Sequence, residues 1–60
     1  MNVLCSGGHL DGQTVFANAK FIETLNNDGE IDVYAVNFVE KTAVYILSRP
    51  FYGKAWPGIH

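Results

Sequence analysis

The sequence has little that could cross-link a small fold. Cys5 is the only cysteine among 60 residues, so no disulfide can form within the chain. At this length a folded chain buries only roughly 60% of the surface that its unfolded form exposes. Small scaffolds usually gain stability from disulfides, a structural metal or oligomerisation. With disulfides excluded, oligomerisation is the aid that we expect.

Long hydrophobic runs and strong charge are also missing. No apolar run approaches the roughly 18 residues of a membrane-spanning helix, and the N-terminus has no basic segment followed by an apolar one. We therefore expect a cytoplasmic protein with no membrane partner. The net charge of −2 argues against non-specific nucleic-acid binding, although residues 41–60 carry three basic residues and no acidic one.

The residues that are present favour a β fold. A hydrophobic fraction of 48% with 17% charged residues is typical of a folded globular chain. β-branched and aromatic residues concentrate in residues 31–48, which we interpret as a hairpin at the centre of a sheet. We expect a single all-β domain over residues 1–60, a twisted meander of four or five antiparallel strands or a small open barrel. Its last part, residues 49–60, is expected to be an irregular aromatic and basic tail.

Turn residues divide the rest of the chain. We expect an edge strand at residues 1–5, a strand at 13–16, a turn at 17–20 and a strand at 21–26. A helix over residues 15–25 is the alternative, but its apolar residues form no regular helical stripe.

The first hairpin register follows from charge. A four-residue loop would set Glu23 opposite Asp32, and like charges destabilise an antiparallel pair. A three-residue loop at 27–29, with Gly29 in the left-handed region, avoids this and pairs Leu25 with Ile31.

The second hairpin register follows from a loop centred on Glu40 and Lys41. A two-residue or a four-residue loop there gives the same cross-strand pairs, namely Phe38 with Ala43, Val36 with Tyr45 and Tyr34 with Leu47.

These registers leave both faces of the sheet apolar. A sheet of this kind either curls around one face or buries a face against a second copy. The first face carries Phe21, Leu25, Ile31, Val33, Ala35, Val39, Val44 and Ile46, and the second carries Ile22, Tyr34, Val36, Phe38, Ala43, Tyr45 and Leu47.

The glycine-rich stretch at residues 7–12 has three interpretations. A phosphate-binding loop would need a helix after it, yet a strand is expected there. A metal site could use Cys5, His9 and Asp11, but it lacks a second ligand cluster. We favour a structural connection between strands.

The same stretch carries a family resemblance. Residues 5–15, CSGGHLDGQTV, contain the pattern Cys-x-Gly-Gly-x-x-Asp-Gly. This resembles the start of small uncharacterised proteins encoded by tailed phages and prophages, which begin with a short strand, such a turn and a β meander. The resemblance implies a phage-encoded protein in the host cytoplasm, and it brings no catalytic residue.

No catalytic, cofactor-binding or metal-binding residue is assigned. Glu30 and Asp32 share one side of a strand, but they flank a turn and we expect both to be solvated. Cys5 lies in an apolar strand, where a thiol is usually inert. At this size an enzyme would also struggle to enclose a pocket, so we expect no enzyme.

Two binding functions are consistent with these features. The favoured one is a protein-interaction module that acts as a homodimer and binds a host or phage protein through Tyr34, Val36, Phe38, Tyr45, Leu47, Tyr52 and Trp56. The alternative is a small nucleic-acid-binding barrel that uses Arg49, Tyr52, Lys54 and Trp56, because aromatic side chains stack on bases.

Overall fold

The chain folds as a single curled β-sheet. A computed structural model describes residues 1–51. These residues contain one 3-10 turn and no α-helix, which confirms the all-β expectation. The elements are β1 Asn2–Ser6, η1 Gly8–Leu10, β2 Thr14–Phe16, β3 Phe21–Leu25, β4 Glu30–Asn37 and β5 Thr42–Pro50.

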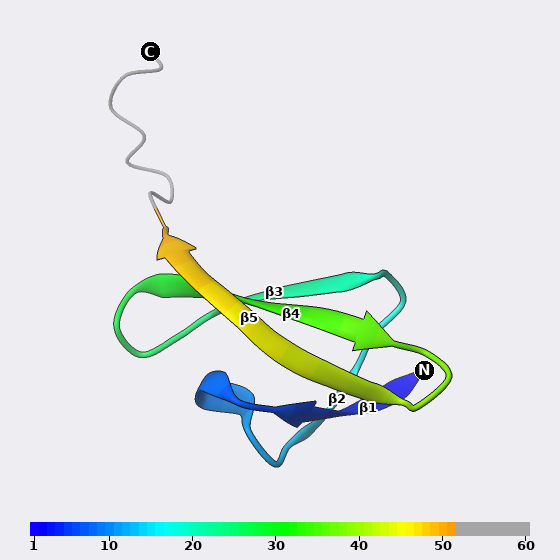
Figure 1. Cartoon of the computed structure of the whole chain (residues 1–60). Coiled ribbons are helices and arrows are strands. Elements are labelled where there is room, and N and C mark those ends of the chain that lie inside the picture. Colours follow the sequence, from blue (N-terminus) through cyan, green and yellow to red (C-terminus); the bar gives the residue numbers. More distant parts are fainter. Residues whose placement is uncertain (52–60) are drawn as a thin grey trace.

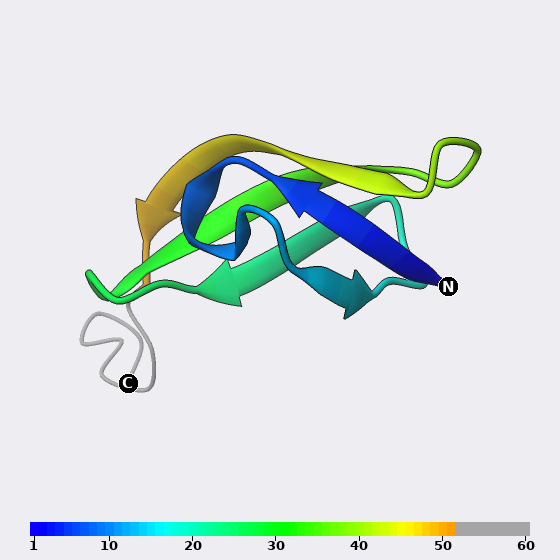
Figure 2. The same ribbon diagram turned by 90° about the horizontal axis from the view of Figure 1, so that it is seen from below.

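The strand order is β2-β1-β5-β4-β3, and the sheet curls into a half-barrel (Figures 1 and 2). All neighbours are antiparallel except β1 and β5, which run parallel and pair Cys5 with Ala43. The sheet is therefore mixed rather than wholly antiparallel. β1 was expected at an edge, and this was wrong, because the parallel pairing places it between β2 and β5.

The β3–β4 hairpin has the predicted register. Leu25 pairs with Ile31, and Gly29 has a φ of 78°, in the left-handed region. The Asn26 side chain holds the turn, because its Oδ1 accepts hydrogen bonds from the backbone N–H groups of Asp28 and Glu30. A strand–turn–strand path replaces the alternative helix over residues 15–25.

The β4–β5 register differs from the prediction. Val36 pairs with Ala43, and Tyr34 pairs with Tyr45, so β5 is displaced by two residues. The loop spans residues 38–41. Asn37 Oδ1 accepts hydrogen bonds from the backbone N–H groups of Val39 and Glu40, which closes the turn one residue earlier in the chain than predicted. A shift of two residues keeps each side chain on its predicted face.

A bulge then changes the face of the second half of β5. After the Tyr34–Tyr45 pair, the next pair is Val33 with Leu47, so Ile46 is an extra residue. A bulge bends its strand and increases the local twist. Leu47 consequently lies on the same face as Val33, and its predicted place beside Tyr34 was wrong. β5 also continues through Pro50, so residues 49 and 50 belong to the sheet rather than to an irregular tail.

The two faces of the sheet have different surroundings. We call the concave side the inner face and the convex side of β3, β4 and β5 the outer face. The buried core lies on the inner face, where it consists of Val3, Cys5, Ala17, Tyr34 and Ala43, with Leu10, Val15, Ile22, Val36 and Tyr45 packed against it. The chain thus covers the inner face by curling, which was one of the two alternatives.

Candidate functional site

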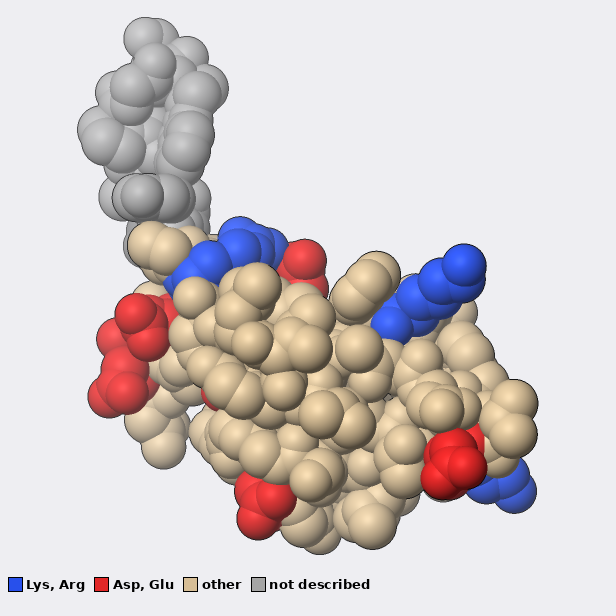
Figure 3. Space-filling model, viewed as in Figure 1, with Lys and Arg blue, Asp and Glu red and all other residues tan. Residues whose placement is uncertain are grey.

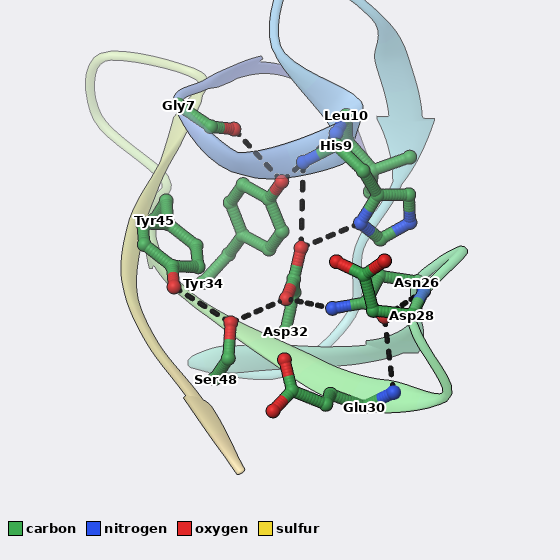
Figure 4. Close-up of polar contacts among 10 residues, drawn as sticks. All are labelled: Gly7, His9, Leu10, Asn26, Asp28, Glu30, Asp32, Tyr34, Tyr45 and Ser48. Carbon is green, nitrogen blue, oxygen red and sulfur yellow. Dashed lines mark hydrogen bonds and ion pairs between the residues drawn. The ribbon is translucent and has the colours of Figure 1, made fainter.

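A polar cluster around Asp32 closes one end of the half-barrel (Figure 4). Asp32 lies on the inner face of β4 and is 3% exposed. Its Oδ1 accepts hydrogen bonds from Ser48 Oγ at 2.6 Å and from Asn26 Nδ2 at 2.8 Å. Its Oδ2 lies 2.6 Å from His9 Nδ1 and accepts a longer bond from the His9 backbone N–H. One carboxylate therefore joins η1, the β3–β4 turn and β5.

These donors keep Asp32 ionised. The hydrogen bonds from Ser48 and then from His9 hold the pKa of Asp32 well below its usual range, and they outweigh the opposing effect of desolvation. An ionised carboxylate can only accept, so His9 Nδ1 carries a proton. The expectation that Asp32 is solvated was wrong, because the turn at Gly7 to Leu10 packs over it.

Tyr34 anchors the same turn at a second point. Its hydroxyl accepts a hydrogen bond from the Leu10 backbone N–H at 2.9 Å and donates one to the Gly7 carbonyl at 2.8 Å. The side chain is fully buried, and desolvation raises its pKa. The Tyr34 ring meets the Tyr45 ring edge to face, with centroids 5.8 Å apart. Figure 2 shows the turn lying across the concave side of the sheet.

The glycine-rich stretch connects β1 to β2, as expected. Gly8 has a φ of 63°, and a Cβ there would clash with the Tyr34 hydroxyl and lie 2.8 Å from Tyr45 Cδ1. Cys5 is buried in the core, where burial raises its pKa, whereas Asp11 Oδ1 accepts a bond from the Gly7 N–H. Within residues 1–51 no three His, Cys, Asp or Glu side chains are placed to hold a metal ion.

A cavity of about 480 Å³ adjoins the Asp32 cluster. Its lining includes His9, Asp28, Glu30 and Ser48. The Tyr45 hydroxyl lies 2.6 Å from Ser48 Oγ and must donate to it, because the Ser48 proton is already bonded to Asp32. Four side chains of the cavity lining, those of His9, Asp32, Tyr45 and Ser48, therefore bond to one another in a chain.

The outer face is largely apolar and exposed. Its side chains on β3 and β5 are about half exposed, whereas Val33 on β4 between them is buried. The half-exposed residues are Phe21, Leu25, Val44, Ile46 and Leu47. Figure 3, with β5 toward the viewer, shows mostly uncharged surface over this strand and charged groups around its margin. Two charged residues lie within the face, where Arg49 Nη2 contacts Glu23 Oε1 at 2.6 Å across β4. Ile31, Val33 and Ala35 lie on β4 between these flanks.

The structure separates the residues that the sequence suggested for partner binding. Tyr34 lies in the core and offers no surface, and Val36 and Tyr45 are partly buried on the inner face. Phe38 is 38% exposed in the β4–β5 loop, while Leu47 lies on the outer face. Tyr52 and Trp56 are outside the described residues.

Of the four residues predicted for the alternative nucleic-acid-binding function, the structure describes only Arg49. Arg49 pairs with Glu23, and Tyr52, Lys54 and Trp56 lie outside the described residues. Sequence reasoning missed the Asp32 cluster altogether. The available signal was an acidic residue inside the most apolar strand, on the face that carries Tyr34.

No protein-family model, curated protein or solved structure matches this chain. Within the described residues no helix is long and apolar enough to cross a membrane.

Proposed function

We propose that this protein is a non-enzymatic protein-interaction module, a phage-encoded accessory protein that acts as a homodimer and binds a host or phage protein. The observation that carries the proposal is the outer face, on which large apolar side chains of β3 and β5 are about half exposed. Contiguous exposed apolar surface on a small protein typically marks a protein-binding site.

The inner face supports a structural role instead. Asp32 and Tyr34 together bind four backbone or side-chain groups of the turn at residues 7–10. All buried side-chain nitrogen and oxygen atoms of the described residues have hydrogen-bond partners. Groups that satisfy one another in this way hold the fold closed, and they favour a binding protein over an enzyme.

The phage origin in this proposal rests on the resemblance of residues 5–15 alone. The nucleic-acid alternative is not favoured by any described contact, since the Arg49 guanidinium is engaged by Glu23. Nucleic-acid binding gains affinity when cationic side chains neutralise phosphates and so release the counterions condensed on them, and the pairing of Arg49 with Glu23 weakens that contribution.

Self-association tests the proposed module. Val44→Lys places a charge within the outer face, whereas Val39→Lys places the same charge in the β4–β5 loop, where the side chain is 91% exposed. In sedimentation equilibrium we expect native protein and V39K to form dimers at high micromolar concentration and V44K to stay monomeric. Native protein that remains monomeric throughout, or equal association of the two variants, would contradict the proposal.

Binding to another protein is tested with the same variants as baits. Native protein, V44K and V39K are immobilised and exposed to a bacterial host lysate. A protein retained by native bait and by V39K, but lost from V44K, supports outer-face-dependent binding. Identical retained sets for all three baits would remove the host partner from the proposal.

A further inference from the structure

We infer that the outer face binds the outer face of a second copy about a two-fold axis, with Glu23 of each copy also contacting Arg49 of the other, a reciprocal pairing that we call the charge exchange. This inference rests on the proposed homodimer, and it identifies the surface and the charges that would form it. The two charged side chains lie on opposite flanks of β4, Glu23 on β3 and Arg49 on β5.

Both charged groups have capacity for further hydrogen bonds. Their side chains are 55% and 48% exposed, respectively, and one Nη2–Oε1 contact joins them. A guanidinium has five N–H donors and a carboxylate has two acceptor oxygens. Each group can therefore bind a second partner of opposite charge without breaking the contact within its own chain.

The position of the charges selects the axis. In a two-fold interface, if one residue contacts another across the interface, the reciprocal contact also forms. An axis along β4 places β3 of one copy over β5 of the other, so Glu23 lies over Leu47 of the partner subunit, with the partner subunit's Arg49 two residues further along that strand. The two side chains already span the same stagger across β4 within one copy, so Glu23 of each copy can reach Arg49 of the other. The result is a ring of four alternating charges. An axis across the strands would instead bring Glu23 toward its own copy, and like charges repel.

The same axis brings apolar side chains together. Phe21 on β3 and Val44 on β5 both pair with Ala35 of β4, one on each side. Rotation about β4 therefore places Phe21 over Val44 of the partner subunit, and the reciprocal contact forms on the other side of the axis. Phe21 is 56% exposed and Val44 is 50% exposed in a single copy. Two sheets packed face to face in this aligned manner are a common arrangement, about 10 Å apart.

Charge reversal tests the exchange. Glu23→Arg gives a copy with two positive charges on its outer face, and Arg49→Glu gives a copy with two negative charges. We expect each variant alone to dimerise at least ~10-fold more weakly than native protein, because like charges then meet at the axis. An equimolar mixture of E23R and R49E should form a mixed dimer with affinity close to that of native protein.

Two loop variants serve as charge-matched controls. Glu40→Arg and Lys41→Glu change the net charge by the same amounts in the exposed β4–β5 loop, and each is expected to dimerise like native protein. Sedimentation equilibrium measures all dissociation constants, and circular dichroism verifies that each variant is folded.

The outcomes separate this inference from the proposed homodimer. If V44K abolishes dimerisation while E23R, R49E and their mixture all dimerise like native protein, the homodimer stands and the charge exchange is wrong. If E23R or R49E unfolds alone, the double variant E23R/R49E restores opposite charges within and between copies and must dimerise. A monomeric but folded double variant would also overturn the exchange.

Discussion

The two faces of this sheet are built from alternate residues of the same strands, yet they are covered in different ways. On the inner face, Tyr34 and Ala43 are fully buried, whereas the outer-face residues Phe21 and Val44 remain about half exposed. The strands themselves do not explain the difference, because both faces are rich in apolar residues. What differs is the polar cluster, which ties the turn at residues 7–10 to one face only.

The comparison indicates that buried polar groups decide which face a small apolar sheet covers by itself. Apolar contact alone is non-directional. On the inner face, Asp32 and Tyr34 supply directional hydrogen bonds to the turn that covers it. On the outer face, the exposed ion pair of Glu23 with Arg49 binds no covering segment within the described residues of one copy. We therefore expect substitutions of the inner polar groups to destabilise the fold more than substitutions of the outer charges.

The largest loss of stability is expected on substitution of Asp32. Asp32→Ala removes an acceptor that is bonded to His9, Asn26 and Ser48, so the donors of three separate segments lose their partner. We expect the variant to lose its cooperative thermal transition, as measured by circular dichroism. Asp28→Asn, an exposed neighbour in the β3–β4 turn, is the control and should unfold like native protein. A cooperative transition close to that of native protein in D32A would show that the cluster does not hold the inner face closed.

Acid should weaken the same cluster. The folded-state pKa of Asp32 is lowered from its ordinary value of 3.8, so the ionised carboxylate stabilises the fold above that value. This contribution is fully present above about pH 5 and is lost as the pH falls through 3.8 toward the folded-state pKa. In urea unfolding experiments, the free energy of unfolding should decrease progressively as the pH is lowered from about 6 to about 3. A constant stability over this interval would contradict the proposed role of the carboxylate.

Substitution of Gly8 tests the packing of the turn. Gly8→Ala combines a left-handed backbone with a Cβ that would clash with the Tyr34 hydroxyl, and we expect a loss of about 3 kcal/mol in the free energy of unfolding. Gly12→Ala is the matched control, because Gly12 also has a positive φ but a Cβ there would meet nothing within 4 Å. Its cost should be about 1 kcal/mol. Equal losses in urea unfolding would mean that the turn is not closely packed on the sheet.

Removal of the Tyr34 hydroxyl is expected to lower the free energy of unfolding by a smaller amount. Tyr34→Phe keeps the buried ring and removes the bonds to Leu10 N–H and the Gly7 carbonyl, so the free energy of unfolding should fall by about 1–2 kcal/mol. Tyr45→Phe removes a hydroxyl that lies at the exposed end of the cluster and should cost less. Chemical unfolding of the two variants compares them directly, and the reverse order would contradict the anchoring role of Tyr34.

The smallest effect on folding belongs to the outer charges. Glu23→Gln removes the exposed ion pair with Arg49, and exposed pairs contribute about 0–1 kcal/mol that salt screens further. At protein concentrations low enough to keep the chain monomeric, we expect the unfolding free energy to change by less than about 0.5 kcal/mol. A loss as large as that of Y34F would remove the contrast between the faces.

Local features of the fold could be predicted from the sequence. The Asn-Asn-Asp-Gly turn and the like charges of Glu23 and Asp32 correctly fixed the β3–β4 register, and alternation correctly grouped Tyr34 with Ala43 and Tyr45. Both inferences depend on residues that are close together along the chain, where turn chemistry and alternation act directly.

The remaining features depend on contacts that a local pattern does not contain. The bulge at Ile46 moved Leu47 to the outer face, and the Asn37 side chain shifted the β4–β5 loop. The Asp32 cluster joins His9, Asn26 and Ser48, which are separated from Asp32 by 23, 6 and 16 positions. Because that clustering requires the completed fold, Asp32 looked like a solvated residue beside a turn.

The parallel pairing of β1 with β5 also affects the order in which the chain can fold. β3, β4 and β5 are joined by short loops, whereas the Cys5–Ala43 pair joins residues from opposite ends of the described chain. Closing a long loop costs conformational entropy before any contact repays it, and non-local pairings slow folding. We therefore expect the three-stranded meander to form first and β1 to dock last. Until β1 docks, the inner side of β5 that carries Ala43 stays open to solvent, so the described sheet is complete only when β1 has paired with β5.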